Sequence, residues 1–101
     1  MSRYILAPQA AQDLIHIWRY IKEQSSLTIA DRVERTIRER MGFLASHPGA
    51  GHWRRDLTSH NVRFFSVYSY LIVYNPDTKP LQIVSILHGR RDVEKILKGR
   101  P

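Results

Sequence analysis

Apolar positions in the first half of the chain recur with the 3.6-residue period of an α-helix. One stripe follows Pro8, which suits a first helical turn, and comprises Ala10, Leu14, Ile17, Trp18 and Ile21. A second stripe follows Thr28 and Asp31, which resemble a capping box, and comprises Ala30, Val33, Ile37, Met41 and Leu44. We predict helices over residues 8–24 and 28–46, and the short connection between them predicts an antiparallel hairpin.

The pattern changes from about residue 62 onward, where apolar positions alternate with a period near two. Segments 62–67, 70–75 and 81–88 are rich in β-branched and aromatic residues and predict three strands. The turn-forming sequence NPDTKP makes the last two strands an antiparallel hairpin. A short β-like run at residues 4–7 precedes the first helix. Asp92 can cap a final short helix that carries Val93, Ile96 and Leu97 and ends at Gly99.

These elements predict a single domain over residues 1–101, because the chain is long enough for one modest core. Each amphipathic helix must bury its apolar stripe, and the sheet offers the surface for it. The expected fold class is α+β. It consists of an N-terminal strand, an antiparallel helix hairpin packed on one face of a mostly antiparallel β-sheet, and a short C-terminal helix.

Charge adds the expectation of an anionic partner. The chain has a formal net charge of +7 and a pI near 10.3. Residues 9–47 hold six basic and five acidic side chains, whereas residues 48–101 hold nine basic and four acidic ones. The positive field is therefore expected over the sheet half, where it favours nucleic acid or an acidic protein segment.

Several kinds of chemistry are excluded by residue types that the chain lacks. It has no cysteine, which rules out disulfides, thiolate metal sites and cysteine nucleophiles. Its five histidines show neither helical i, i+4 pairing nor an HExxH motif, so no metal site is expected. No run of about 18 apolar residues occurs, and the N-terminal apolar run is too short for a signal sequence. We expect a soluble cytoplasmic protein without cofactors or membrane contact.

The segment HGRRD at residues 88–92 places a histidine and two arginines between the last strand and the final helix. His88 is either a packed strand-end histidine whose nitrogens find backbone partners, or an acid–base group that titrates near neutrality. Gly89 suits a hinge with unusual backbone angles. Arg90 and Arg91 are either exposed chain or partners of Asp92 and Glu94, or else they form a fork that binds carboxylates or phosphates.

Strand alternation also assigns side chains to faces of the sheet. It places His88 on the same face as Val84 and Ile86. It places Arg63 on an apolar face, where a charge must reach a partner or the surface. The simplest partner for Arg63 is Asp56, with which it would form a salt bridge.

The segment that precedes this strand carries two further arginines and a tryptophan. Arg54 and Arg55 are expected in a loop or edge strand, where Asp56 can neutralise one of them. Trp53, like Trp18 in the first helix, is expected to be core or half-buried, although large aromatic residues also serve as interface anchors.

Three segments resemble the RelE/ParE superfamily of toxins from bacterial type II toxin–antitoxin modules. They are APQAAQDLIHIWRYI in the first helix, HPGAGHWRRDL followed by VRFFSVYSYLIVY, and the tail ILHGRRDVEKIL. The resemblance covers nearly the whole chain and is closest to the ParE branch. It implies a small basic toxin that a co-expressed antitoxin holds inactive. ParE-like toxins block DNA gyrase, whereas RelE-like relatives of the same fold cut mRNA in the ribosomal A site, so the residues must decide.

The residues favour the gyrase inhibitor. Relatives that cleave RNA usually supplement the strand arginine with a glutamate or lysines after the second helix and an aromatic residue near the C-terminus. Here residues 48–62 contain neither Glu nor Lys, and no aromatic residue follows Tyr74. We therefore predict an inhibitor without catalytic residues, whose partner-binding residues are Trp18, Arg54, Arg55, Arg63, Arg90 and Arg91.

Two alternatives stay open. The first is a ribosome-dependent endoribonuclease with the catalytic residues Arg63, His88, Arg90 and Arg91. The second is a degenerate module that binds only its antitoxin or DNA. In each case the antitoxin is expected to present an acidic and apolar C-terminal segment, and operator DNA is expected to be bound only through the antitoxin.

Overall fold

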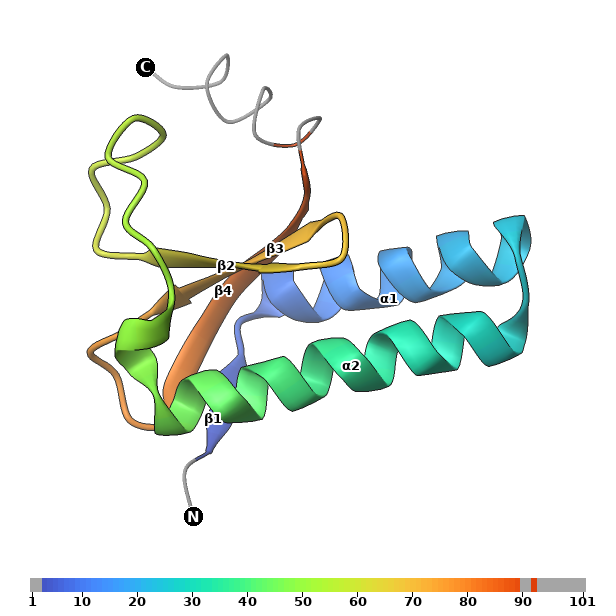
Figure 1. The fold of residues 1–101 in the computed structure, drawn as a ribbon, viewed down its shortest axis with the longest axis horizontal. Helices are drawn as coiled ribbons and strands as arrows, with labels where there is room; N and C mark the ends of the chain where they lie inside the picture. Colours follow the sequence, from blue (N-terminus) through green and yellow to red (C-terminus); the bar gives the residue numbers. More distant parts are fainter. Residues whose placement is uncertain (1–2, 90–91, 93–101) are drawn as a thin grey trace.

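The computed structural model describes residues 3–89 together with Asp92 (Figure 1). The elements in chain order are β1 (Tyr4–Leu6), α1 (Pro8–Gln24), α2 (Leu27–Ser46), the 3₁₀ turn η1 (Pro48–Ala50), β2 (Arg63–Val67), β3 (Tyr70–Asn75) and β4 (Leu81–His88). The two long predicted helices and all four predicted strands are confirmed, with ends that agree to within one residue. Periodicity located these elements because each of them buries one face.

The four strands form one mixed sheet in the order β1-β4-β3-β2. β3 pairs antiparallel with both β4 and β2, as the hairpin prediction requires. β1 instead runs parallel to β4, with Tyr4 opposite Leu81. Parallel neighbours need a long connection, and here the helix hairpin, β2 and β3 all lie between the two strands in sequence. The Lys79–Pro80 peptide bond in the β3–β4 connection is cis.

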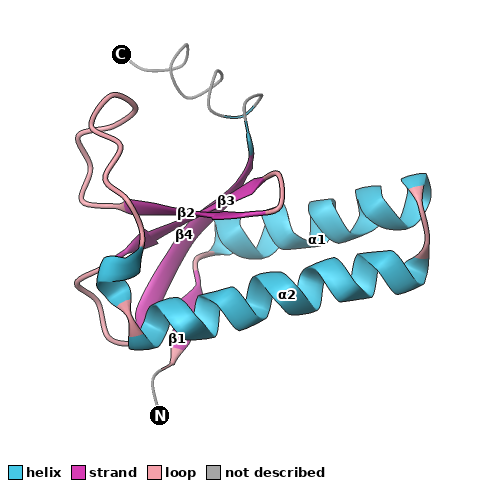
Figure 2. Ribbon diagram, viewed as in Figure 1, coloured by secondary structure: helices cyan, strands magenta, loops and turns pink. Residues whose placement is uncertain are grey.

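The main core lies between the sheet and the two helices, which run side by side in opposite directions (Figure 2). Its buried members from the helices are Ala10, Leu14, Ile37, Met41 and Leu44. Those from the sheet are Val67, Tyr70, Ile72, Tyr74, Leu81, Ile83 and Ile86. The expected packing of both helices on one face of the sheet is therefore confirmed, and the predicted apolar stripes supply the helical side of this core.

A second, smaller apolar cluster covers part of the opposite sheet face. Leu57 from the loop between η1 and β2 packs there with Phe64 and Val73, and all three are at most 5% exposed. In Figure 1 this loop rises on the side of the sheet away from the helices. The sequence pattern does not reveal this cluster, because Leu57 stands alone in a polar segment.

The assignment of strand faces near His88 needs one correction. The pairing of β3 with β4 shifts register between Val73 and Tyr74, and this bulge leaves Val84 as an extra residue. Val84 therefore packs against the second cluster, whereas Ile86 belongs to the main core. The prediction that His88 shares a face with Val84 is wrong, because one inserted residue reverses the alternation.

The start of α2 differs from the predicted capping box. Ser26, not Thr28, is the N-cap residue, and its hydroxyl accepts a hydrogen bond of 3.1 Å from the backbone N–H of Ile29. Asp31 serves another purpose, because its carboxylate accepts a bond of 2.8 Å from the indole N–H of Trp18. This bond joins the two helices near their connection.

Ser26→Ala is expected to lower the free energy of unfolding by about 1 kcal/mol, because the Ile29 N–H loses its capping acceptor. Thr28→Ala is the matched control, and we expect it to change stability by less than about 0.5 kcal/mol. Urea unfolding followed by circular dichroism measures both. A larger loss of unfolding free energy for Thr28→Ala than for Ser26→Ala would show that Thr28, as in the predicted capping box, is the capping residue.

The chain turns sharply after β4. Gly89 has a φ of +29°, and a Cβ at this position would lie 2.8 Å from the carbonyl oxygen of Ser69. The predicted hinge at Gly89 is confirmed, because both the backbone angle and the close contact require glycine. The remainder of the predicted final helix, residues 93–99, lies outside the described residues. Within the described part of the chain, no helix has the length and apolar content needed to cross a membrane.

Candidate functional site

Two arginines stack on one exposed tryptophan at the start of β2. The guanidinium carbon Cζ of Arg55 lies 4.4 Å from the centroid of the Trp53 ring, and that of Arg63 lies 4.3 Å from it. We call these three residues the Trp53 cluster. Tryptophan is the side chain that holds cations best through its ring face. Of the two predicted alternatives for Trp53, a core position is wrong and a half-buried one agrees with the structure, since the residue is 38% exposed and its ring is partly covered by guanidinium groups.

Backbone pairing explains how two members of the cluster meet. His52 forms an isolated antiparallel bridge with Phe64, through two backbone hydrogen bonds of 2.8 Å. In an antiparallel pair the residue after His52 lies opposite the residue before Phe64. This places Trp53 beside Arg63, although the loop between them gives no periodic signal in the sequence.

The side chain of Arg63 is anchored on backbone carbonyls. Its Nη1 donates to the oxygen of Gly51 at 2.8 Å and to that of Gly49 at 3.3 Å. The buried Tyr74 hydroxyl fixes this turn, since it donates to the Pro48 oxygen at 2.7 Å and accepts from the Gly51 N–H at 2.8 Å. Burial raises the pKa of Tyr74, so its phenol keeps the proton that it donates. The Nε of Arg63 is buried and has no hydrogen-bond partner among the described residues.

The predicted salt bridge between Arg63 and Asp56 is wrong, because Asp56 binds Arg54. Nε and Nη2 of Arg54 lie 3.0 Å and 2.8 Å from the two carboxylate oxygens. This hydrogen bonding raises the pKa of Arg54 and lowers that of Asp56. Arg55 instead donates to two main-chain carbonyls of its own loop, at 3.4 Å and 3.5 Å. Among the described residues, Arg55 and Arg63 therefore have no carboxylate partner.

Trp18 lies in a different part of the molecule, on the helix hairpin. Its indole N–H binds Asp31, and Nζ of Lys22 lies 5.0 Å from the centroid of its ring. The side chain is half-buried, as predicted. These contacts give Trp18 a structural role in joining α1 to α2, and its predicted contact with a partner stays a prediction.

His88 occupies the far end of β4 and packs as a strand-end histidine. Its ring contacts the ring of Tyr70 edge-on, with the centroids 5.4 Å apart. Its backbone N–H donates to a carboxylate oxygen of Asp92 at 2.6 Å. The prediction that the ring nitrogens find backbone partners is wrong for Nδ1, which is buried and has no partner among the described residues.

A hollow of about 530 Å³ lies beside His88. It is lined by Asp13, His16, Ile17, Tyr20, Tyr70, Ile86, His88 and Asp92. The contributions of α1 to this hollow were not predicted, because Asp13 and Tyr20 lie on the polar side of a helical stripe. Asp13 binds the edge of β4 directly, since its carboxylate accepts a bond of 2.9 Å from the backbone N–H of Ile86.

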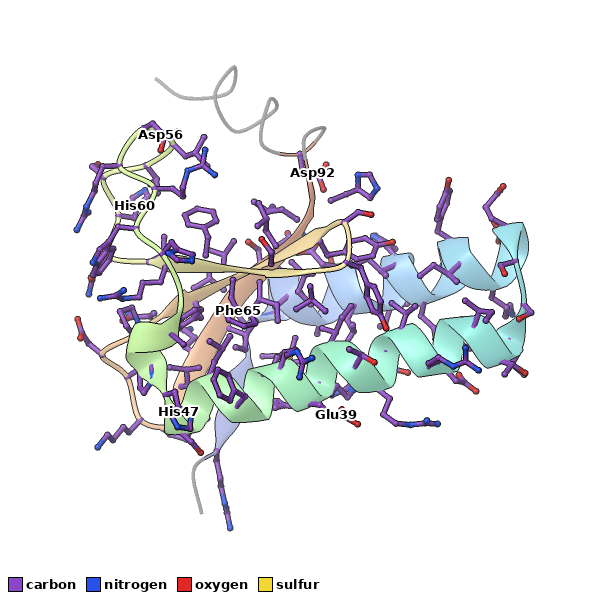
Figure 3. All side chains as sticks on the ribbon, in the orientation of Figure 1. Glu39, His47, Asp56, His60, Phe65 and Asp92 are labelled. Atoms are coloured by element: carbon purple, nitrogen blue, oxygen red, sulfur yellow. The ribbon has the colours of Figure 1, made fainter. Side chains whose placement is uncertain are left out.

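Arg63 and His88 lie at opposite ends of the sheet. Arg63 pairs with Tyr74 at one end of β3, whereas His88 pairs with Tyr70 at the other. Four residues along β3 and two strand spacings separate the positions by roughly 13 Å along the sheet and about 10 Å across it. Figure 3 likewise shows the loop that carries Asp56 and His60 apart from Asp92. The two described residues of the ribonuclease alternative, Arg63 and His88, are therefore not gathered around one point.

Arg90 and Arg91 lie outside the described residues, so the fork that they are predicted to form stays a prediction. In residues 3–89 and Asp92, no group of histidine and acidic side chains is arranged to hold a metal ion. The fold and the Trp53 cluster together define a small basic α+β domain that presents fixed cations at one end of its sheet.

Comparison with known proteins identifies the family. A family model for the ParE toxin of the type II toxin–antitoxin system parDE matches residues 4–93. The chain therefore belongs to the ParE toxin family of type II toxin–antitoxin systems. A solved structure of the chromosomal ParDE system from P. aeruginosa has the same fold, with a TM-score of 0.73 and 20% sequence identity. This match covers 89% of the present chain and 98% of the other. No curated protein matches the sequence.

Proposed function

We propose that this chain inhibits DNA gyrase, performs no catalysis of its own, and is neutralised by a cognate antitoxin encoded with it. Membership of the ParE family supports the toxin role. The observation that carries the choice of mechanism is the distance between Arg63 and His88 across the sheet. Gyrase inhibition needs a binding surface, whereas RNA cleavage needs converging reactive groups.

The chemistry of RNA cleavage explains why this distance matters. A base must remove the 2′-hydroxyl proton, an acid must protonate the leaving oxygen, and cations must stabilise the phosphorane between them. Such groups act within hydrogen-bonding reach of one scissile phosphate. In this chain the ring of His88 packs on Tyr70, while Arg63 is held by carbonyls near η1. A single phosphate cannot contact both side chains in this arrangement.

The surface of the helix layer supports an antitoxin with an apolar segment. Several large apolar side chains there are about half exposed, among them Ile15, Tyr20, Leu27 and Phe43. Exposed apolar surface of this kind is typical of protein interfaces. The net positive charge favours acidic residues in the same segment. Operator DNA is then bound through the antitoxin, which supplies the DNA-binding part of the complex.

The decisive experiment compares two reactions on one preparation of purified toxin. We expect the toxin to block supercoiling of relaxed plasmid by gyrase and to leave ribosome-bound mRNA intact. His88→Ala should change supercoiling inhibition by less than about twofold, because the ring contacts Tyr70 inside the fold. Arg90→Ala combined with Arg91→Ala should weaken it by about tenfold or more, because charge-assisted hydrogen bonds are lost.

The matched control is Arg32→Ala with Arg40→Ala, which removes two exposed arginines of α2 and should leave inhibition nearly unchanged. Cleavage of A-site mRNA that disappears in His88→Ala, with supercoiling untouched, would establish the ribonuclease instead. Absence of both activities would establish the degenerate module. Co-purification of the toxin with the product of the neighbouring small gene tests the antitoxin part separately.

A further inference from the structure

We propose that the Trp53 cluster binds the phosphate backbone of duplex DNA, and that through it the toxin grips the DNA that gyrase holds. The contact with gyrase-held DNA rests on the proposed function. The isolated toxin is expected to bind duplex DNA whether or not it inhibits gyrase. The inference assigns a ligand class to Trp53, Arg55 and Arg63, and it separates them from the segment around His88.

The Trp53 cluster carries two positive charges that no carboxylate of the described residues neutralises. Arg55 and Arg63 stack on the same ring, so their guanidinium carbons lie no more than about 9 Å apart and their charges repel. Their hydrogen bonds go to neutral carbonyl oxygens, and among the described residues neither has a carboxylate partner. The neighbouring Arg54 is different, since Asp56 compensates it. Two close, uncompensated cations form a site that an anion completes.

The two cations are fixed in place. The ring of Trp53 holds both groups, and Nη1 of Arg63 is tied to Gly51 through a turn that the Tyr74 hydroxyl locks. Arginines held in this way lose little side-chain entropy when they bind. A mobile pair of surface arginines would instead have to be ordered by the ligand. The cluster is therefore pre-organised for binding.

The shape of the guanidinium groups indicates which kind of anion the cluster binds. Guanidinium groups bind phosphate oxygens as planar forks, and a DNA strand presents a row of regularly spaced phosphates. Backbone contacts of this kind carry no sequence information, and the cluster contains no amide side chain that would read a base edge.

The net charge of the chain favours DNA over an acidic protein segment as the ligand of the cluster. The whole chain has a formal net charge of +7, and Arg55 and Arg63 have no carboxylate partner among the described residues. A positive net charge attracts a polyanion more strongly than a single carboxylate. Exposed apolar side chains suited to a protein partner, such as Ile15, Tyr20 and Leu27, lie on the helix hairpin and not in the Trp53 cluster. The two sets of residues therefore suit two different partners.

The test measures binding of the purified toxin to a fluorescein-labelled duplex of about 20 base pairs by anisotropy over a range of salt concentrations. Arg55→Gln combined with Arg63→Gln is expected to raise the Kd about tenfold or more. It should also reduce the slope of log Kd against log salt by about two, since each lost phosphate contact removes roughly one counterion. Arg32→Gln with Arg40→Gln has the same net charge and should leave the slope unchanged.

Two single variants keep the test valid if the double variant unfolds. Trp53→Ala retains every charge but releases both guanidinium groups, and we expect it to raise the Kd several-fold. If only the net charge mattered, Trp53→Ala would bind the duplex with the Kd of the wild type. Arg55→Gln alone alters an exposed side chain and should reduce the salt slope by about one. Thermal unfolding of each variant confirms that it is folded.

Three outcomes would overturn the inference. They are an equal loss in the α2 control, tighter binding of single-stranded RNA than of duplex DNA, and tighter binding of a polyglutamate peptide. Loss of duplex binding in the cluster variants with supercoiling inhibition unchanged would support the DNA site and remove its role on gyrase. Wild-type duplex binding without any inhibition of gyrase would refute the proposed function and leave the DNA site standing.

Discussion

Gly51→Ala is expected to lower the free energy of unfolding by about 2–4 kcal/mol, a large effect for one added methyl group. A Cβ at this position would overlap the hydroxyl of Tyr74. The ring of Tyr74 is fully buried, so it has little room to withdraw. Any shift breaks two hydrogen bonds, to the Gly51 N–H and to the Pro48 oxygen, and buried groups without partners are costly.

Chemical denaturation of the purified variant measures this loss, and Gly42→Ala provides the control. Gly42 lies inside α2, and a Cβ there meets nothing within 4 Å. Alanine at that position should raise stability by about 0.5–1 kcal/mol, because glycine is a poor helix former. If Gly51→Ala were as stable as the wild type, the turn would not be packed as described.

This turn also links stability to the Trp53 cluster. The carbonyl of Gly51 is the nearer of the two that hold Arg63. A displaced turn should therefore loosen Arg63 and weaken duplex binding, even where enough protein remains folded. Tyr74 thus supports a site that its own side chain does not form.

Asp13→Ala is expected to lower the free energy of unfolding by about 1–3 kcal/mol, because it leaves a buried backbone donor without its acceptor. The carboxylate of Asp13 accepts from the N–H of Ile86, a residue that is 3% exposed. β1 pairs with the outer edge of β4 only as far as Ile83. Beyond it the backbone N–H of Ile86 has the Asp13 side chain as its acceptor. The same carboxylate also accepts from Gln9 at 2.8 Å.

Amide hydrogen exchange tests this role more directly than overall stability does. The Ile86 amide should exchange faster in Asp13→Ala than expected from the change in global stability. Asp13→Asn keeps an oxygen acceptor and should retain most of the protection, with a smaller loss of stability because a neutral acceptor binds less strongly. Unchanged exchange at Ile86 in Asp13→Ala would show that water replaces the carboxylate without cost.

The sequence by itself determined the elements, their order and the layer arrangement. Each follows from a repeated local requirement, since a helix or strand with one buried face must place apolar residues at its own period. The stripe from Ala10 to Ile21 and the alternation after residue 62 therefore identified α1 and the sheet. Charge and the absence of cysteine depend on composition alone, so they too were readable before any fold was known.

Only the tertiary structure decided which side chains meet. Trp53 and Arg63 are brought together by the single bridge between His52 and Phe64, and no local pattern encodes that pairing. One extra residue at Val84 reversed the expected faces near the end of β4. Contacts of this kind depend on strand register and on the path of a loop, which are set by packing across the whole domain. The sequence therefore named the arginines, and the fold decided that Arg63 meets Trp53 and lies far from His88.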